Sequence, residues 1–338
     1  MKRYLVTGGC GFIGSHLVDH LVAGGNQVRV LDDLSAGTPA FLPATVELLT
    51  GSATEPGTVR AATRNVDGCF HLAAVASVAR CNKAWLDSHH TNLSATIRLF
   101  ELASATSERH FPVVYASSAA VYGEQPVVPL CENMPVQPCS PYGADKASCE
   151  LHARAGAVAR GLTAAGLRFF NVYGPRQRPD SPYSGVISIF AERIRHGRPL
   201  TIYGDGDQTR DFVFVDDVVR ALVRTMRRLE GADERPMAEV YNVCSGQPTG
   251  VRELATRLMA LGRSEVPIDY AAPRAGDIRH SVGSPDRLLH AIGIRPSMAL
   301  DEGLYRTLNG LGAGAAVSRS RRPRRAMPSS ISAGEFSE

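Results

Sequence analysis

The chain is poor in lysine. Of its 37 basic residues, 34 are arginines, and the lysines are Lys2, Lys83 and Lys146. The excess of positive charge is also small, because 37 basic and 33 acidic residues leave a net charge of +4 on 338 residues. A balance this close to neutral does not by itself indicate a nucleic-acid-binding protein.

Cysteine pairs and long apolar runs are absent as well. The seven cysteines are odd in number and no two are spaced as CxxC, which argues against a disulfide framework and a zinc site. No apolar run approaches the ~18 residues of a membrane span, and Met1-Lys2-Arg3 is followed by too few apolar residues for a signal-peptide core. These absences exclude a membrane protein, a secreted scaffold and a disordered chain, and leave a cytoplasmic enzyme as the expectation.

The first two-thirds of the chain alternates short β-branched runs with longer amphipathic stretches. Strands are predicted for residues 4–7, 28–31, 46–49, 69–72, 113–116 and 167–170, and helices for 12–23, 92–105 and 144–160. This alternation predicts an α/β fold of Rossmann type, a doubly wound parallel sheet with helices on both faces and a smaller C-terminal α/β lobe.

The alternation loosens after Gly174. A helix is predicted for residues 187–196, and strand-like runs return at 212–215 and 240–243. The predicted parts are a main domain of residues 1–174 with returning segments at about 211–248, a lobe of residues 175–210 and 249–311, and a tail of residues 312–338. Because the tail is rich in Gly, Ala, Ser, Arg and Pro and has no apolar period, it is predicted to be disordered.

A glycine-rich loop lies between the first predicted strand and the first predicted helix. Gly8, Gly11 and Gly14 have the spacing GxxGxxG, which allows a tight turn and a close approach of the backbone to a pyrophosphate at the helix N-terminus. Asp32 ends the second predicted strand, where an acid can bind both ribose hydroxyls and repel a 2′-phosphate. The pattern favours NAD over NADP. The alternative is a tight turn and a strand-end acid in a nucleotide-free fold.

One of the three lysines lies four residues after a tyrosine. Tyr142 and Lys146 share a helix face at this spacing, and a nearby ammonium favours the phenolate form of a tyrosine, which can then act as an acid or base near neutral pH. Ser118 follows the strand predicted for 113–116, and its hydroxyl could hold a substrate oxygen beside the phenol. The alternative is a surface Tyr/Lys pair.

At this point the sequence resembles an extended short-chain dehydrogenase/reductase of the NAD-dependent nucleotide-sugar epimerase/dehydratase family, and it is most similar to UDP-glucose and UDP-N-acetylglucosamine 4-epimerases. The resemblance covers residues 4 to about 310. The matching segments are TGGCGFIG (7–14), HLAA (71–74), SSAAVYG (117–123), YGADK (142–146), RFFNVYGPRQ (168–177), GDGDQTRDFVFVDDV (204–218) and RAGDIRHS (274–281).

The resemblance implies a role for each matching residue. Ser118, Tyr142 and Lys146 would be catalytic. The residues expected to bind NAD are Gly8, Gly11, Phe12, Ile13, Gly14, Asp32, Asp33, Leu72, Ala73, Ala74, Tyr142, Lys146 and Phe170. Those expected to bind the UDP-sugar are Ser118, Asn171, Val186, Tyr203, Arg210, Arg274, Asp277 and Ser281. The resemblance also implies a homodimer joined through helices near 92–106 and 144–160. No metal is expected, because His89, His90 and His280 lack ligand spacing.

The residues after Ser118 bear on the type of reaction. Members of the resembled family begin by oxidising C4 of the sugar, and its dehydratases carry an acidic pair directly after the catalytic hydroxyl. This chain has Ala119-Ala120 there, and it also lacks the glutamate typical of the decarboxylases in this stretch. We therefore expect 4-epimerisation through a 4-keto sugar. The alternatives are a UDP-glucuronate 4-epimerase, a reductase that releases NADH, and a non-catalytic NAD-binding protein.

Other features of the sequence leave the substrate open. In the resembled family the position of Ser281 walls the sugar pocket near C2, where a small residue admits an N-acetyl group without excluding glucose; a solvated loop serine is the alternative. Gly51-Ser52 stands where the resembled family often has a Gly-Asp pair, whose aspartate contacts the adenine amine. The segment of residues 79–90 is longer than its counterpart in similar sequences. It could shape the sugar pocket, and the alternative is a surface loop. The arginines of 319–325 could touch nucleic acid or lipid, but a solvated tail is preferred.

Overall fold

The computed structural model describes residues 1–106, 110–179, 185–231, 236–273 and 277–319. Its largest sheet has seven strands, and every neighbouring pair in it is parallel. In spatial order the strands are β10 (Met237–Val243), β6 (Thr163–Phe169), β5 (Val113–Ser118), β4 (Gly68–His71), β1 (Arg3–Thr7), β2 (Gln27–Asp32) and β3 (Glu47–Thr50). The order reverses between β1 and β4, which is where ligands bind in open α/β sheets.

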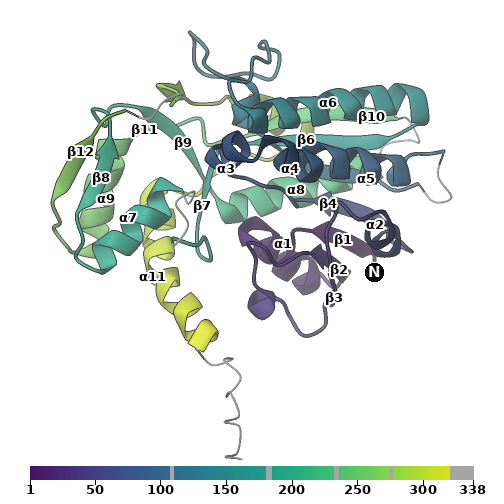
Figure 1. Cartoon of the computed structure of the whole chain (residues 1–338), viewed down its shortest axis with the longest axis horizontal. Helices are drawn as coiled ribbons and strands as arrows, with labels where there is room; N and C mark the ends of the chain where they lie inside the picture. Colours follow the sequence, from purple (N-terminus) through teal and green to yellow (C-terminus); the bar gives the residue numbers. More distant parts are fainter. Residues whose placement is uncertain (107–109, 180–184, 232–235, 274–276, 320–338) are drawn as a thin grey trace, which may run out of the picture.

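Helices cover both faces of this sheet and bury two separate apolar clusters (Figure 1). The helices of the first face are α1 (Phe12–Ala23) and α8 (Val215–Glu230), and those of the second face are α2 (Pro56–Ala62), α5 (Ala95–Ala103) and α6 (Pro141–Arg160). Because both faces are covered, the central strands are almost wholly buried, and all seven residues of β6 are buried. This confirms the predicted doubly wound fold of Rossmann type.

A second group of elements lies beside the seven-stranded sheet and encloses its own apolar cluster (Figure 1). Its strands are β7 (Asn171–Tyr173), β8 (Leu200–Tyr203), β9 (Thr209–Phe214), β11 (Pro248–Gly250), β12 (Ile268–Ala271) and β13 (His280–Ser281). Its helices are α7 (Val186–Arg195), α9 (Val251–Gly262) and α11 (Leu300–Arg319), whereas α10 (Asp286–Ile292) packs against the main sheet. Strand β9 pairs with β7, β11 and β13, so it is the strand around which this second sheet is built.

Three segments differ from the sequence-based expectations. The strand expected at 212–215 ends at Phe214, because Val215 already begins α8. Residues 79–90 form mainly the short helices α3 (Val78–Lys83) and α4 (Trp85–His89) rather than a surface loop, and a π-helix (His90–Ser94) leads from them into α5. Helix α11 extends to Arg319, past residue 312, where the predicted tail begins. Residues 320–338 lie outside the described part of the chain.

In the described residues we find no helix with the length and apolarity required to cross a membrane.

Candidate active site

The glycine loop packs tightly against the end of β4 and against itself. A Cβ atom on Gly8, whose φ is +70°, would lie 2.7 Å from the backbone nitrogen of Ala73, and one on Gly14 would lie 2.1 Å from the Gly8 carbonyl oxygen. The loop therefore lies directly beside the 72–74 segment. Gly11 caps α1 without a side-chain hydrogen bond, and the first turn of α1 contains no acidic residue. The first turn of α1 thus carries no carboxylate of its own that would compete with a bound anion for its amides.

Asp32 ends β2 next to this loop and is buried. Its Oδ2 accepts a hydrogen bond from the Cys10 amide (2.9 Å), and its Oδ1 accepts one from the Leu34 amide (2.8 Å). Burial raises the pKa of Asp32, although the two amide hydrogen bonds partly oppose that shift. The neighbouring Asp33 is exposed, and its Oδ1 accepts from the Ser35 amide. Of the two adjacent carboxylates, Asp32 is the one that the fold holds against the glycine loop.

Ser118, Tyr142 and Lys146 approach one another at the carboxyl edge of the sheet. Ser118 is the last residue of β5, and Tyr142 and Lys146 lie in the first two turns of α6. A Cβ atom on Gly143 would lie 2.5 Å from the Ala120 carbonyl oxygen, so α6 starts in direct contact with the segment after Ser118. The Ser140 side chain caps α6 by accepting from the Gly143 amide (3.1 Å).

Lys146 is held in place by the strand beneath it. Its Nζ donates to the Ala116 carbonyl oxygen (2.8 Å) and lies 5.9 Å from the centre of the Tyr142 ring, and only 4% of its surface is exposed. The structure thus brings together the three residues that the sequence predicts to be catalytic.

His71 links β1, β4 and the helix after the π-turn through two hydroxyl groups. Thr96 donates to the Asn92 carbonyl oxygen (2.8 Å), so it must accept from His71 Nε2 (3.0 Å). His71 Nδ1 is then the acceptor for the Thr7 hydroxyl (2.7 Å). Burial and the charge of Lys146 lower the pKa of His71 to about 3, so the ring is neutral at pH 7. Because Thr7 also accepts from the Ala73 amide (3.2 Å), this neutral ring fixes the 72–74 segment.

A buried ion pair lies one helical turn beyond Lys146. Arg168 on β6 donates to both carboxylate oxygens of Glu150 on α6, at 2.9 Å and 2.7 Å, and its guanidinium lies 4.7 Å from the centre of the Tyr122 ring. The Ser117 hydroxyl donates to the same carboxylate (2.6 Å). The pair therefore joins α6 to the ends of β5 and β6 directly beneath Ser118.

Helix α6, which carries Tyr142 and Lys146, also contacts α3 and α4, the helices formed by the long segment of residues 79–90. Asp145 is buried, and one of its oxygens pairs with His89 Nδ1 of α4 at 2.8 Å. Its other oxygen has no hydrogen-bond partner in the described parts of the chain. Since Asp145 directly precedes Lys146, residues 78–89 are attached to the same helix that carries Tyr142 and Lys146, the two residues predicted to be catalytic.

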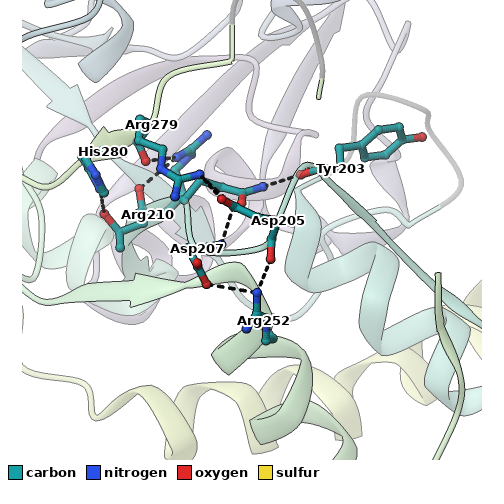
Figure 2. Close-up of polar contacts among 9 residues, drawn as sticks. Tyr203, Asp205, Asp207, Arg210, Arg252, Arg279 and His280 are labelled. Atoms are coloured by element: carbon teal, nitrogen blue, oxygen red, sulfur yellow. Dashed lines mark hydrogen bonds and ion pairs between the residues drawn. The ribbon is translucent and has the colours of Figure 1, made fainter. Parts of the chain in front are cut away.

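Arg210, one of the residues expected to bind the UDP part of the substrate, lies on β9 beside a cluster of charged side chains (Figure 2). Arg210 donates to Asp277 (2.5 Å), so these two predicted ligand contacts are paired with each other. Arg279 Nη1 donates to both carboxylate oxygens of Asp205, at 2.7 and 2.8 Å. These hydrogen bonds lower the pKa of the Asp205 carboxyl to about 2. Arg252 donates to the Asp205 carbonyl oxygen and pairs with the Asp207 carboxylate. In Figure 2 the ring of Tyr203 points away from this cluster.

Asp211 fixes the position of Ser281 relative to Arg210. Its fully buried carboxylate accepts hydrogen bonds from the Ser245 amide and hydroxyl and from the amides of Gly246 and Gly283, at 2.7–3.3 Å. Ser281 is half-buried in β13 and lies opposite Arg210 in the β9 register. A Cβ atom on Gly283 would lie 2.5 Å from the Phe170 ring, so Phe170 lies directly beside this segment.

The remaining residues predicted to bind the UDP-sugar are Asn171, Val186 and Arg274. Asn171 is exposed at the start of β7, and Val186 is the half-buried first residue of α7. Arg274 lies outside the described residues.

Sequence reasoning missed the supports of the site, namely Glu150, Arg168, Asp145, His89 and Asp211. One signal was available for the first two. Arg168 interrupts an apolar run read as a buried strand, which requires a partner for its charge. Glu150 lies on the Tyr142–Lys146 face of the same helix, four residues after Lys146.

Comparison with known proteins agrees with this arrangement. Residues 4–244 match the model of the NAD dependent epimerase/dehydratase family. A UDP-glucose 4-epimerase of Mycolicibacterium smegmatis is 38% identical over 314 residues, covering 90% of this chain and 97% of that protein.

Two solved structures have the same fold. The UDP-N-acetylglucosamine 4-epimerase of Methanobrevibacter ruminantium, in complex with UDP-N-acetylmuramic acid, superposes with a TM-score of 0.85 at 34% identity, covering 93% of this chain and 99% of that one. The UDP-glucose 4-epimerase of Thermus thermophilus in complex with NAD gives a TM-score of 0.83 at 34% identity, covering 92% and 99%.

Proposed function

Because this chain belongs to the NAD-dependent epimerase/dehydratase family, an enzyme family whose cofactor is NAD, we propose that it is a UDP-hexose 4-epimerase. The proposed substrates are UDP-glucose and UDP-galactose together with their N-acetylamino counterparts. The observation that carries the proposal is the placement of Ser118, Tyr142 and Lys146 at one edge of the sheet with Ala119-Ala120 beside them. The proposal assigns residues 1–174 and 211–248 to NAD, and residues 175–210 and 249–311 to the sugar nucleotide.

The glycine loop fits a dinucleotide pyrophosphate. Side chains at Gly8 or Gly14 would fill the space between the loop and the backbone around it, and the uncapped amides of the first α1 turn suit a negative charge. The buried Asp32 is proposed to accept hydrogen bonds from the adenosine ribose. When bound, NAD⁺ supplies the chemistry of hydride acceptance from C4 and its return.

Tyr142 is the proposed acid and base. Its phenolate takes the proton of the sugar 4-hydroxyl during oxidation and gives a proton back to the C4 oxygen during reduction, so the residue ends as it began. Lys146 stabilises the phenolate by its charge, and the Ser118 hydroxyl holds the C4 oxygen beside the ring. Ala119 and Ala120 have no group that can move a proton at C5 or C6, which favours epimerisation over dehydration.

Arg210 is proposed to bind the diphosphate of the substrate. In the described structure its guanidinium is paired with Asp277, a pair that keeps the positive charge beside Ser281. A diphosphate would take hydrogen bonds from the same guanidinium, while Asp277 is proposed to bind the uridine ribose. Arg274 is included in this group on the basis of its place in the motif.

Replacing Asp32 by asparagine is expected to weaken NAD binding by about 10–100-fold, because two charge-assisted hydrogen bonds to the ribose become neutral ones. The ratio of NADP to NAD affinity should rise in the same variant, since the repulsion of a 2′-phosphate is removed. Equilibrium binding of both dinucleotides to the cofactor-stripped protein measures this. Asp33→Asn is the matched control; a larger loss of NAD affinity there would contradict the role of Asp32.

Replacing Ser281 by tyrosine is expected to narrow the substrate range. A bulky ring near C2 of the sugar should reduce kcat/KM for UDP-N-acetylglucosamine at least about 100-fold while changing that for UDP-glucose by less than about tenfold. Steady-state rates with both substrates measure the effect, and Ser284→Thr serves as a control in the same segment. Equal losses for both sugars would show that Ser281 does not discriminate at C2.

Incubation with three separate sugar nucleotides tests the proposed function. The purified enzyme is given UDP-glucose, UDP-N-acetylglucosamine or UDP-glucuronate without added cofactor, and NMR follows the appearance of 4-epimers. Conversion of either of the first two supports the proposal. Conversion of UDP-glucuronate alone would make the chain a uronate epimerase, and conversion of none would favour a non-catalytic NAD-binding protein. Release of NADH in amounts matching the sugar would identify a net oxidoreductase.

The proposal includes a homodimer joined through α5 and α6. Leu151 and Val158 on α6 are 62% and 87% exposed, and α6 packs along α5. Apolar side chains this exposed on one helix suit a second copy of the same surface. Light scattering on the purified protein measures the mass, and a monomer at micromolar concentration would contradict this part.

A further inference from the structure

A hollow of about 530 Å³ lies on the outer side of α8 and involves none of the predicted site residues. It is bordered by α1, α8 and the segment between α10 and α11. The residues that line it, which we name the arginine groove, are His20, Arg220, Val223, Arg224, Arg227, Gly293, Ile294, Arg295 and Ser297.

The arginine groove has four arginines and no acidic residue in its lining. Arg220, Arg224 and Arg227 follow one another at helical spacing on the exposed face of α8, and Arg295 faces them from the neighbouring segment. Arg220 donates to Asp217 and to Ser297. In the described ranges of the chain, the other three arginines form no hydrogen bond or ion pair.

The lining of an adjoining hollow toward α11 contains acidic residues, so the purely basic charge of the arginine groove is confined to that groove. That second hollow, of about 500 Å³, is lined by Asp216, Asp217 and Glu302 as well as by Arg220 and Arg306. Arg306 there pairs with Glu302 at 2.7 Å. Asp217 contacts Arg220 of the arginine groove from outside its lining, and its carboxylate also accepts hydrogen bonds from the amides of Ser297 and Met298. Among the described residues, the guanidinium groups of Arg224, Arg227 and Arg295 therefore line this hollow without a hydrogen bond or ion pair to a carboxylate.

We propose that the arginine groove binds a small molecule that carries two or three phosphoryl groups. Guanidinium groups donate pairs of hydrogen bonds to phosphate oxygens, and the volume lies in the range of small-ligand sites. Val223 and Ile294 add apolar surface for a ring attached to the phosphates, which points to a nucleoside polyphosphate. A long nucleic acid would need a charged stripe rather than one short hollow, and the chain as a whole carries only +4.

The groove is separate from the proposed active site. His20 lies nine residues after Gly11 in the sequence, roughly 13 Å along α1 from the amides proposed to hold NAD. Ser118, Tyr142 and Lys146 are associated with α6, which covers the opposite face of the sheet. An occupant of the arginine groove would therefore bind in addition to NAD and the sugar nucleotide, and the inference stands whether or not the proposed epimerase activity is correct.

Titration calorimetry of the NAD-loaded enzyme with inorganic tripolyphosphate in 150 mM salt tests the inference. The wild type should bind saturably, and Arg224→Gln combined with Arg227→Gln should raise Kd at least tenfold. The matched control, Arg60→Gln combined with Arg195→Gln, removes the same charge from exposed positions on α2 and α7 and should change Kd less than twofold. Arg210→Gln, which removes a guanidinium of the proposed substrate site, should also leave Kd unchanged.

Three results would overturn the inference. The first is no saturable binding of tripolyphosphate to the wild type. The second is a loss of binding in Arg210→Gln with none in the groove variant, which would place the anion in the substrate site. The third is tighter binding of a single-stranded DNA oligonucleotide than of tripolyphosphate, lost in the groove variant, which would assign the arginines to a nucleic acid. Titration of ADP in the same variants checks the apolar part, because ADP should bind at least as tightly as inorganic pyrophosphate.

Discussion

Tyr142→Phe is expected to lower kcat for UDP-sugar epimerisation by about 10²–10⁴-fold, because it removes the hydroxyl that moves the proton of the 4-hydroxyl group. The ring itself should stay in place, since Tyr142 is held in the first turn of α6 by the Ser140 cap and by the contact of Gly143 with Ala120. The variant should therefore keep its NAD and its thermal stability. Initial rates, the absorbance of bound dinucleotide and a melting curve measure the three quantities.

The exposed Tyr305 provides the matched control for this variant. It is 52% exposed on α11, so Tyr305→Phe should retain wild-type kcat. Lys146→Met should also lose activity, because it removes both the ammonium and the hydrogen bond to the Ala116 carbonyl. A Tyr142→Phe enzyme that turns over at more than about a tenth of the wild-type rate would show that another group moves the proton.

Arg168→Met and Glu150→Gln are each expected to reduce the free energy of unfolding by about 3–5 kcal/mol. The side chains are only 3% and 7% exposed, so either substitution leaves a charge buried without its counter-charge. Glu150→Gln should also lower kcat, because the Ser117 hydroxyl then donates to a neutral amide oxygen instead of a carboxylate, and Ser117 precedes Ser118 on β5. Urea unfolding and steady-state kinetics of both variants measure these effects.

The combined variant separates the ion pair from the packing around it. Arg168→Met with Glu150→Leu should be less destabilised than either charge-leaving single variant, since no isolated charge remains. The exposed pair of Glu253 and Arg257 on α9 is the control; Glu253→Gln should cost less than about 1 kcal/mol. Losses of that small size for Arg168→Met and Glu150→Gln would contradict the structural role of the pair.

The fold class could be predicted, and candidate catalytic residues could be named, because their signals are local in the sequence. Alternating apolar and amphipathic runs are enough to indicate a doubly wound sheet. The glycine spacing before α1 and the four-residue spacing of Tyr142 and Lys146 place chemistry on one turn or one helix face. Asp32 could be named as a candidate ribose-binding residue because it is the last residue of β2, the first strand after the glycine loop. Each of these inferences needs only the period of the backbone and a short stretch of sequence.

The supports of the site depend on packing and could not be predicted in this way. Glu150 and Arg168 are 18 residues apart, Arg210 and Asp277 are 67 apart, and His89 and Asp145 are 56 apart. Whether a charged residue is solvated or buried against an opposite charge depends on which elements cover it, and the cost of burial then dictates its partner.

Packing also decides which environment each arginine of this lysine-poor chain occupies. Composition alone gives 34 arginines and a net charge near neutrality. The folded chain buries Arg168 against a carboxylate and pairs Arg210 with Asp277 at the proposed substrate site. It also gathers Arg224, Arg227 and Arg295 around one hollow, where these three form no ion pair with another residue in the described part of the chain. Local spacing is sufficient to specify secondary structure and the Tyr–Lys pair, whereas the environment of each charge arises only when distant elements pack and exclude water.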